Sequence, residues 1–342
     1  GLPDLFYRYQ ADISQALVDQ LAPHALPLYD TLRYYMGWVD TDGVPSVLAE
    51  GKRLRPTLCL LACEAAGGMR RRAMPAAVAL EFIHNFSLIH DDIEDGDRIR
   101  HHRPTLWAVW GEPTAIVSGN VLITLADITI QSLVDHGVSK VIACEAAETL
   151  TVNYLRMMEG QYQDIQFESR SNVTVDEYLQ MIERKTGALI ECSVYLGALV
   201  GPSRRPDRVL AQKLRQVGYE LGRIFQIRDD ILGIWGGAAT GKPVGSDIQR
   251  KKKSLPVIHA INESQGRTSR LLSEIFSKSS ISKSDVDCVL DVMEELDTRN
   301  YCQNLAAERW ELGKSVIESL PLNSQSASDF IELGDFLLVR ES

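Results

Sequence analysis

AAVALEFIHNFSLIHDDIED, residues 76–95, is apolar along most of its length and ends in aspartates. Successive residues of an α-helix lie ~100° apart, so residues three, four and seven apart share a face. One face of this stretch therefore carries His84, Ser87, Asp91 and Asp95. Because the apolar pattern runs without a break into the acidic end, it predicts a buried helix that presents two carboxylates in its last turn.

The acidic end of this helix predicts a bound cation. Two carboxylates four residues apart destabilise a helix unless a positive charge compensates them. Carboxylate oxygens suit Mg²⁺, which typically takes one or two protein carboxylates together with waters and substrate phosphates. A basic stretch that includes Arg98 and Arg100 follows directly. A surface network of ion pairs between these arginines and the aspartates is the alternative explanation.

A second acidic pair decides between these explanations. Asp229 and Asp230 lie in the apolar stretch GRIFQIRDDILGIW, residues 222–235, three residues after Gln226. Short basic motifs occur at residues 51–56 (GKRLRP), 98–103 (RIRHHR), 184–187 (RKTG) and 241–254 (GKPVGSDIQRKKKS). The last of these does not have the G-x-x-x-x-G-K-[ST] pattern of nucleotide-binding loops. Two acidic pairs with four basic motifs predict a site for a diphosphate bound through both metal ions and cationic side chains.

Composition limits the class of protein. The chain has 342 residues, 45% of them hydrophobic and 24% charged, which is typical of globular proteins. Its net charge of −10 argues against nucleic acid as the main partner. The six cysteines form no C-x-x-C pair, which predicts buried thiols and a cytoplasmic protein. No uncharged run reaches the ~20 residues of a membrane span, so none is expected.

Helical periodicity dominates the whole chain. Further helices are predicted at residues 54–67, 112–134, 140–167, 174–200, 207–235 and 296–318. Thr174 and Glu177 are spaced as a capping box. No convincing strand pair, linker or repeat is found. The pattern predicts one all-α domain over residues 1–342, with the motifs in about 45–260 and C-terminal helices at 296–340 packing on it.

In this order the motifs resemble those of the trans-isoprenyl diphosphate synthases, the farnesyl and geranylgeranyl diphosphate synthase group. The matching stretches are GKRLRP, HNFSLIHDDIED, EGQYQD (159–164), RKTGAL, FQIRDDILG, GKPVGSD and KKKS. The resemblance implies a bundle of helices around a deep apolar cavity, with the two acidic motifs facing each other at its mouth. It also implies a homodimer.

The resemblance assigns a role to each matching residue. Mg²⁺, roughly three ions per active site with diphosphate bound, would be held by Asp91, Asp92, Asp95, Asp229 and Asp230. The allylic diphosphate would be bound by Arg100, Lys185, Thr186, Gln226, Lys242 and Lys252. Isopentenyl diphosphate would be bound by Lys52, Arg55, His84 and the residue at position 101. Product length would be set by Ile83, Phe86 and Ser87. The catalytic residues would be Asp91, Asp95, Asp229, Lys185 and Gln226.

Two positions depart from the family pattern. His101 stands where a second arginine is common, and an imidazole binds diphosphate more weakly than a guanidinium does. Arg103 could take the place of that arginine. Gly233 stands where many members carry a third aspartate, which leaves the second motif one carboxylate short.

The resemblance implies a Mg²⁺-dependent short-chain prenyltransferase. It would condense isopentenyl diphosphate with dimethylallyl, geranyl or farnesyl diphosphate by ionisation, condensation and elimination. Geranylgeranyl diphosphate is the expected product and farnesyl diphosphate the next. A terpene cyclase on the same fold, to which His101 gives some support, is one alternative. A non-catalytic partner subunit of another prenyl synthase is the other, although such a subunit would be expected to lose acidic ligands that this chain retains.

Overall fold

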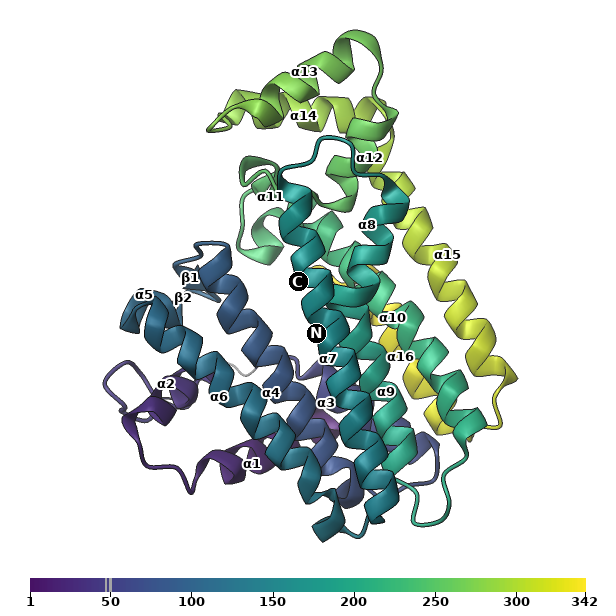
Figure 1. Ribbon diagram of the computed structural model, residues 1–342. Coiled ribbons are helices and arrows are strands. Elements are labelled where there is room, and N and C mark those ends of the chain that lie inside the picture. The colour runs from purple at the N-terminus through teal and green to yellow at the C-terminus, as the bar shows by residue number, and fades with distance from the viewer. Residues whose placement is uncertain (47, 49–50) are drawn as a thin grey trace. The chain divides into compact units, whose positions relative to one another are not determined.

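The computed structural model describes residues 1–46, 48 and 51–342, and this part of the chain is almost entirely helical (Figure 1). The predicted all-α class is confirmed. Contacts group the chain into two compact units, residues 1–152 with 192–214 and residues 153–191 with 215–342. The single domain stays a prediction. Three helices nevertheless belong to both units, because each continues along the chain from one unit into the other. These are α7 (Lys140–Glu168), α9 (Ala188–Val200) and α10 (Arg208–Trp235).

Unit 1 is built around α4, the helix of the opening stretch. Its elements are α1 (Asp4–Leu21), α2 (Pro27–Tyr35), α3 (Leu54–Ala65), α4 (Arg70–Glu94), β1 (Ile99–Arg100), β2 (Arg103–Pro104), α5 (Leu106–Trp110), α6 (Glu112–Gln131) and the 3-10 helix η1 (Ser132–His136). Helix α4 packs along both α3 and α6 (Figure 1). It is buried around most of its circumference from Ala76 to Ile83, as its nearly uniform apolar sequence predicts.

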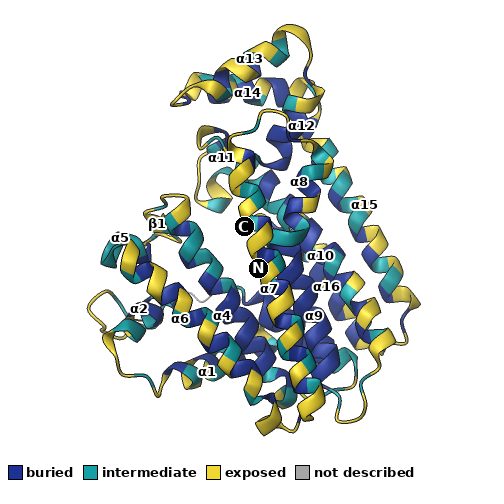
Figure 2. Cartoon of the chain, in the orientation of Figure 1, coloured by how far each residue is buried: buried dark blue, intermediate teal, exposed yellow. Residues whose placement is uncertain are grey.

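Unit 2 contains the second acidic pair on the C-terminal half of α10. Its other elements are α8 (Val175–Ile182), the π-helix η2 (Glu183–Gly187), the 3-10 helix η3 (Gly237–Thr240), α11 (Ser246–Gln249), α12 (Leu255–Glu263), α13 (Gly266–Ser277), α14 (Lys283–Glu295), α15 (Thr298–Ser319) and α16 (Ser324–Val339). Helices α13 and α14 lie side by side (Figure 1). Helix α9 is buried along its whole length (Figure 2).

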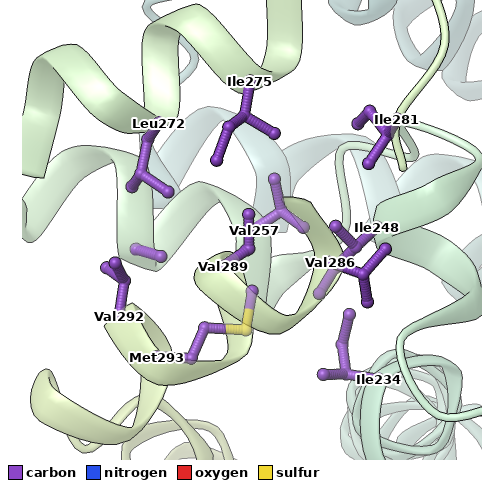
Figure 3. Packing of buried hydrophobic residues seen from close by; sticks show 11 residues of the cluster. Ile234, Ile248, Val257, Leu272, Ile275, Ile281, Val286, Val289, Val292 and Met293 are labelled. Carbon is purple, nitrogen blue, oxygen red and sulfur yellow. The ribbon is translucent and has the colours of Figure 1, made fainter. Parts of the chain in front are cut away.

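A compact apolar cluster stabilises the part of unit 2 that follows α10 (Figure 3). It joins Ile234 of α10 and Ile248 of α11 to side chains of α12, α13 and α14, and both isoleucines are fully buried. Burying one such side chain contributes roughly 1.5–3 kcal/mol. The cluster therefore fixes the loop between α10 and α11 against the helices around it.

Two predictions about secondary structure were wrong in detail. A strand pair does exist: Ile99 pairs with Pro104 and Arg100 with Arg103 in a short antiparallel hairpin. The predicted helix 174–200 is not regular, because the π-helix η2 interrupts it. The capping box at its start is confirmed, since the Thr174 hydroxyl accepts from the Glu177 amide at 3.1 Å.

The cysteines agree with the prediction of buried thiols only in part. Four are buried, Cys288 is half-buried and Cys144 is exposed. Cys144 lies on the exposed face of α7, which a helix presents to solvent every three to four residues.

Within the described residues, one helical stretch is long and apolar enough to cross a membrane, Glu112–His136. About half of it is covered, since 44% of its apolar window is buried. The buried part includes Leu122, Leu125 and Ala126 of α6, which belong to the core. A core helix meets the same criteria of length and composition, so the absence of a membrane span stays a prediction.

Glu220 of α10 predicts a pH dependence of stability. Its side chain is buried, and one carboxylate oxygen has no hydrogen-bond partner among the described residues. Burial raises the pKa of Glu220 to about 7, although the charge of Arg309 opposes this. The folded chain then holds a proton that the unfolded chain releases at its ordinary, lower pKa. The free energy of unfolding should therefore fall as the pH rises from about 4.5 to about 7.

Glu220→Gln should remove this part of the pH dependence and stabilise the chain by up to about 3 kcal/mol at pH values above the folded-state pKa. Denaturant unfolding of both proteins across the range from acidic to alkaline pH would measure it. Parallel pH profiles for the two proteins would show that Glu220 does not titrate as described.

Candidate active site

The end of α4 is a concentrated negative site. Asp91 is half-buried, Asp95 is exposed, and the last turn of the helix contains no basic residue. The C-terminal end of a helix carries a partial negative charge, which is normally balanced by Lys, Arg or His in the last turn. Here the aspartates add to that charge. The arrangement favours a cation that comes from outside the helix.

Asp92, unlike Asp91, is buried and binds a side chain of the protein. It is 1% exposed, and its Oδ1 accepts hydrogen bonds from Arg100 Nε at 2.9 Å and Nη2 at 2.7 Å. Burial raises the pKa of Asp92, although the ion pair with Arg100 opposes this. Arg100, a predicted ligand of the allylic diphosphate, is thus positioned by the predicted metal ligand Asp92.

Arg100 is presented by the β1–β2 hairpin. The two turn residues, His101 and His102, both have left-handed backbone, with φ of 48° and 64°. Such turns normally use Asn or Gly, so two histidines here carry local strain. The His101 side chain is exposed at the tip. Arg103 is held elsewhere, since it donates to the carbonyl oxygens of Tyr34 at 2.8 Å and Val39 at 3.1 Å.

A basic cluster surrounds His84 in unit 1. Burial and then the charges of Arg55, Arg100 and Arg53 hold the pKa of His84 well below its usual value, so the ring is neutral at pH 7. Arg55 is 7% exposed and Lys52 is half-buried nearby in sequence. Three guanidinium groups that depress the protonation of one histidine indicate a positive potential suited to an anion.

Arg53 was not predicted from the sequence as a site residue. It is 7% exposed, its Nη1 pairs with Glu81 at 3.3 Å, and its Nε has no hydrogen-bond partner among the described residues. The motif GKRLRP contains it, but the sequence does not show which of its basic residues lies inward. A left-handed backbone at Arg53, with φ of 54°, sets that direction just before α3.

Phe86 lies on the face of α4 that packs against α6. Its side chain is 6% exposed, and its ring meets that of His90 edge to face with centroids 4.8 Å apart. His90 Nε2 is 3.1 Å from the carbonyl oxygen of Ile116, and a Cβ on Gly119 would lie 2.4 Å from the same atom. Of the other predicted chain-length residues, Ile83 is fully buried, and Ser87 donates to the His84 carbonyl at 2.6 Å.

The second acidic pair repeats the division between exposed and buried aspartates. Asp229 is half-buried, whereas Asp230 is fully buried. Both oxygens of Asp230 accept protein hydrogen bonds, from Gln226 Nε2 at 3.0 Å, the Leu255 amide at 3.0 Å and the Tyr178 hydroxyl. Asp230 thus joins α10 to α8 and to the start of α12. Its predicted role as a metal ligand stays a prediction.

The π-helix η2 carries Lys185 and Thr186. Thr186 Oγ1 donates to Gln226 Oε1 at 2.7 Å, which continues the network that ends at Asp230. Lys185 Nζ donates to Asp164 of the EGQYQD motif. Gly160 allows α7 to approach this closely, because a Cβ there would lie 2.2 Å from the Lys185 amide nitrogen. π-Helical turns are frequent at functional sites.

Lys252 lies among the acidic side chains of unit 2. Burial lowers its pKa, but the charges of Asp247, Asp230, Asp164 and Asp229 outweigh this and raise it. Its ammonium is 3.9 Å from the Asp247 carboxylate. Lys242, the other predicted lysine of this region, is exposed in the loop before α11.

Arg340 contacts a predicted site residue, although the sequence motifs did not indicate it. Its guanidinium donates to Asp229 Oδ1 and lies over the Phe225 ring, 4.7 Å from the centroid. Arg228 Nε donates to the Arg340 carbonyl at 2.7 Å. Arg340 is separated from Asp229 by 111 residues and belongs to no motif, so only the fold brings them together.

Each unit thus gathers its own part of the predicted site. Unit 1 brings together Asp91, Asp92 and Asp95 at the end of α4, Arg100 on β1, and Arg55 and His84 in the basic cluster. Unit 2 brings together Lys185, Thr186, Gln226, Asp229, Asp230 and Lys252. Within the described residues, no group of three or more His, Cys, Asp or Glu side chains is arranged to hold a metal ion alone.

Comparison with known proteins agrees with these motifs. The model of the family described as polyprenyl synthetase matches residues 43–293. A geranylgeranyl diphosphate synthase of Mycobacterium tuberculosis strain H37Rv is 35% identical over 338 residues, which covers 98% of this chain and 93% of that protein. A (2E,6E)-farnesyl diphosphate synthase of Mycobacterium bovis is 34% identical over 330 residues, covering 95% of this chain and 89% of that protein.

The fold agrees as well. The crystal structure of a polyprenyl synthetase from Streptomyces coelicolor A3(2) superposes with a TM-score of 0.90 at 34% identity, and the match covers 98% of this chain and 99% of that one. Since the family model covers most of the chain and the relatives extend over nearly all of it, the chain belongs to the polyprenyl synthetase family of prenyltransferases.

Proposed function

We propose that the chain is a short-chain trans-prenyltransferase that condenses isopentenyl diphosphate with an allylic diphosphate. The observation that carries the proposal is the repeated arrangement of an outward aspartate beside a buried one, each close to basic side chains. The relatives named above make geranylgeranyl or farnesyl diphosphate according to their names. Geranylgeranyl diphosphate is the first expected product here and farnesyl diphosphate the second.

Asp91, Asp95 and Asp229 are proposed to hold Mg²⁺, roughly three ions per site with diphosphate bound. The residues fit the ion: their oxygens are the ligands Mg²⁺ prefers, and the last turn of α4 contains no basic residue of its own. Protein carboxylates would share each ion with diphosphate oxygens and water, as Mg²⁺ sites usually do. When bound, the metal would neutralise charge on the departing diphosphate. The Asp229 carboxylate would then bind both the metal ion and the Arg340 guanidinium.

The basic residues are proposed to divide between two substrates. Arg100, Lys185 and Lys252, with Thr186, Gln226 and Lys242, would bind the allylic diphosphate. Lys52, Arg55 and the neutral His84 would bind isopentenyl diphosphate, with Arg53 beside them. As the allylic C–O bond breaks, Arg100, Lys185 and Lys252 would stabilise the diphosphate that leaves with the electron pair. The double bond of isopentenyl diphosphate then attacks the allylic cation, and a proton is lost to the released diphosphate.

Incubation of the protein with Mg²⁺, isopentenyl diphosphate and each allylic primer in turn tests the proposal. Mass spectrometry of the aqueous and organic phases should show longer diphosphates only when isopentenyl diphosphate is present. A hydrocarbon or alcohol formed from an allylic diphosphate alone would instead indicate a terpene cyclase. No product with any primer, in the presence of intact Mg²⁺-diphosphate binding, would favour the non-catalytic subunit.

Phe86 is proposed to limit product length, with Ile83 and Ser87 nearby. Phe86→Ala should lengthen the main product by one or more isoprene units, because it removes a buried ring from the α4–α6 face. Product diphosphates would be compared by mass spectrometry. Leu88→Ala, about 200° further round the helix, is the matched control. An unchanged product distribution in an active Phe86→Ala enzyme would remove Phe86 from this role.

We also propose that the chain is a cytoplasmic homodimer. Apolar side chains on α6 and α7 of unit 1 support the dimer. They are Ile116, Val117, Ile128, Val141 and Val152, all exposed. A shallow groove of about 350 Å³ between the same helices is lined by both apolar and polar residues, among them Ile130 and Thr151. Sedimentation of the purified protein would measure the oligomeric state.

A further inference from the structure

The π-helix η2 (Glu183–Gly187) needs support from outside itself. π-Helical turns are rare and occur mostly as single turns inside longer helices. This one interrupts the run from α8 to α9, and it carries Lys185 and Thr186, two of the residues proposed to bind the allylic diphosphate. The direction of both side chains therefore depends on the contacts that hold the turn in its π-helical form.

One face of α10 lies against η2. Thr186 Oγ1 donates to Gln226 Oε1 at 2.7 Å. A Cβ on Gly222 would lie 2.9 Å from Gly187 Cα, so the two backbones are in close contact there. These contacts fix the last two residues of η2. Residues three, four and seven apart share a helix face, and this face of α10 carries Tyr219, Gly222, Arg223 and Gln226.

The other two residues of this face hold the first residue of η2. The Arg223 guanidinium forms an ion pair with Glu183 Oε1, and the Tyr219 hydroxyl donates to the same oxygen at 2.7 Å. Arg223 also lies over the Tyr219 ring, 4.8 Å from its centroid. Two donors that converge on one carboxylate oxygen define the position of Glu183. Helix α10 therefore holds η2 at both of its ends.

The burial of Arg223 costs stability. The residue is 8% exposed, and its Nε and Nη1 have no hydrogen-bond partner among the described residues. Burial lowers the pKa of Arg223 to about 10, and the positive charge of Arg309 on α15 adds to this effect. Replacement of a buried ion pair by apolar residues is often neutral or stabilising. Stability therefore does not account for this arginine, whereas its contact with the substrate-binding turn does.

We propose that Arg223, assisted by Tyr219, positions the π-helical turn through Glu183 and so aligns Lys185 and Thr186 with the allylic diphosphate. This inference rests on the proposed function. Arg223 acts through Glu183, so it is a positioning residue and not a catalytic one. Its loss should affect the allylic substrate, which η2 is proposed to bind. Isopentenyl diphosphate, which is assigned to residues of unit 1, should be affected much less.

Calorimetry with farnesyl S-thiolodiphosphate, an allylic analogue that ionises poorly, measures this effect in the presence of Mg²⁺. Arg223→Leu should weaken binding of the analogue about tenfold or more, because small displacements of positioning groups have large effects. In elongation assays the KM of the allylic primer should rise, while that of isopentenyl diphosphate stays within about threefold of the wild type. Arg223→Lys keeps the positive charge and should recover part of the loss.

The double variant E183L/R223L separates positioning from stability. It leaves no unpaired charge, so thermal unfolding should show it to be at least as stable as Arg223→Leu. Its affinity for the analogue should nevertheless stay about tenfold below that of the wild type, because η2 lacks its first anchor. Arg215→Leu is the matched control, since it removes an ion pair of α10 with Glu191, at 3.0 Å, that does not involve η2. It should bind the analogue like the wild type.

Wild-type affinity of folded Arg223→Leu for the analogue would overturn the inference. So would recovery of both stability and affinity in E183L/R223L, because the ion pair would then be structural only. Equal losses for the two substrates would overturn it as well, since they indicate a general defect. If Arg223→Leu does not fold, Arg223→Lys and E183L/R223L decide by the same criteria.

Product formation by the wild type separates this inference from the proposed function. A wild type that elongates its primer while E183L/R223L binds the analogue normally refutes only the role of Arg223. A wild type that never elongates a primer refutes the proposed function.

Discussion

Asp91→Ala is expected to lower product formation by about 10²–10³-fold or more while the fold is kept. The large kinetic effect follows because an outward carboxylate at the end of α4 is proposed to hold the metal that stabilises the leaving diphosphate. The small effect on stability follows because a half-exposed side chain that is not part of the core changes the free energy of unfolding by about 0.5 kcal/mol.

Steady-state turnover with saturating Mg²⁺ and thermal unfolding without Mg²⁺ measure the two parts of this prediction. Glu94→Ala is the matched control, since Glu94 is an exposed carboxylate in the same last turn of α4. It should keep near-normal turnover. If Asp91→Ala kept near-normal turnover too, the account of the first acidic motif would be wrong.

Asp230→Ala is expected to destabilise the chain on the order of 3–5 kcal/mol. Asp230 is fully buried and accepts hydrogen bonds from Tyr178, Gln226 and the Leu255 amide. Its removal leaves these buried donors unsatisfied, and each such donor costs about 1–3 kcal/mol. Asp230→Asn should cost less, because the amide keeps one acceptor oxygen.

Urea unfolding of the two variants and the wild type measures this effect. Asp287→Ala is the control and should lose much less stability, because Asp287 is an exposed carboxylate on α14 of the same unit. An Asp230→Ala protein as stable as the wild type would show that the network of α8, α10 and α12 does not depend on this carboxylate.

Much of the fold and the motifs of the site could be predicted from the sequence. The helix that carries Asp91 near its C-terminal end follows from an apolar pattern with no interruption, and the capping box at Thr174 follows from two residues three apart. Such signals depend only on residues close together in the chain, so a single sequence is enough to reveal them. The basic residues near the acidic pairs were likewise visible as motifs.

The roles within each acidic pair could not be predicted. Asp91 and Asp92 have the same chemistry, and only the partner, Arg100 on a hairpin eight residues later, shows which of them faces the protein. The hairpin itself was missed because its strands are two residues long and its turn uses His101 and His102 with positive φ rather than Asn-Gly.

Contacts distant in sequence account for the other residues that were missed. Arg340 meets Asp229 across 111 residues, and no motif marks it. Arg223 was visible in the stretch GRIFQIRDDILGIW, but its pairing with Glu183 depends on the packing of α10 against η2. A sequence pattern reports spacing along the chain, whereas these contacts depend on the packing of separate helices.

The most direct test of the account compares the two members of each acidic pair. Calorimetry would measure Mg²⁺-dependent pyrophosphate binding by the alanine variants of Asp91, Asp92, Asp229 and Asp230, each under conditions where the variant is folded. The account predicts that the variants of Asp91 and Asp229 bind at least about tenfold more weakly than those of Asp92 and Asp230. Equal losses within each pair, or greater losses at Asp92 and Asp230, would contradict it.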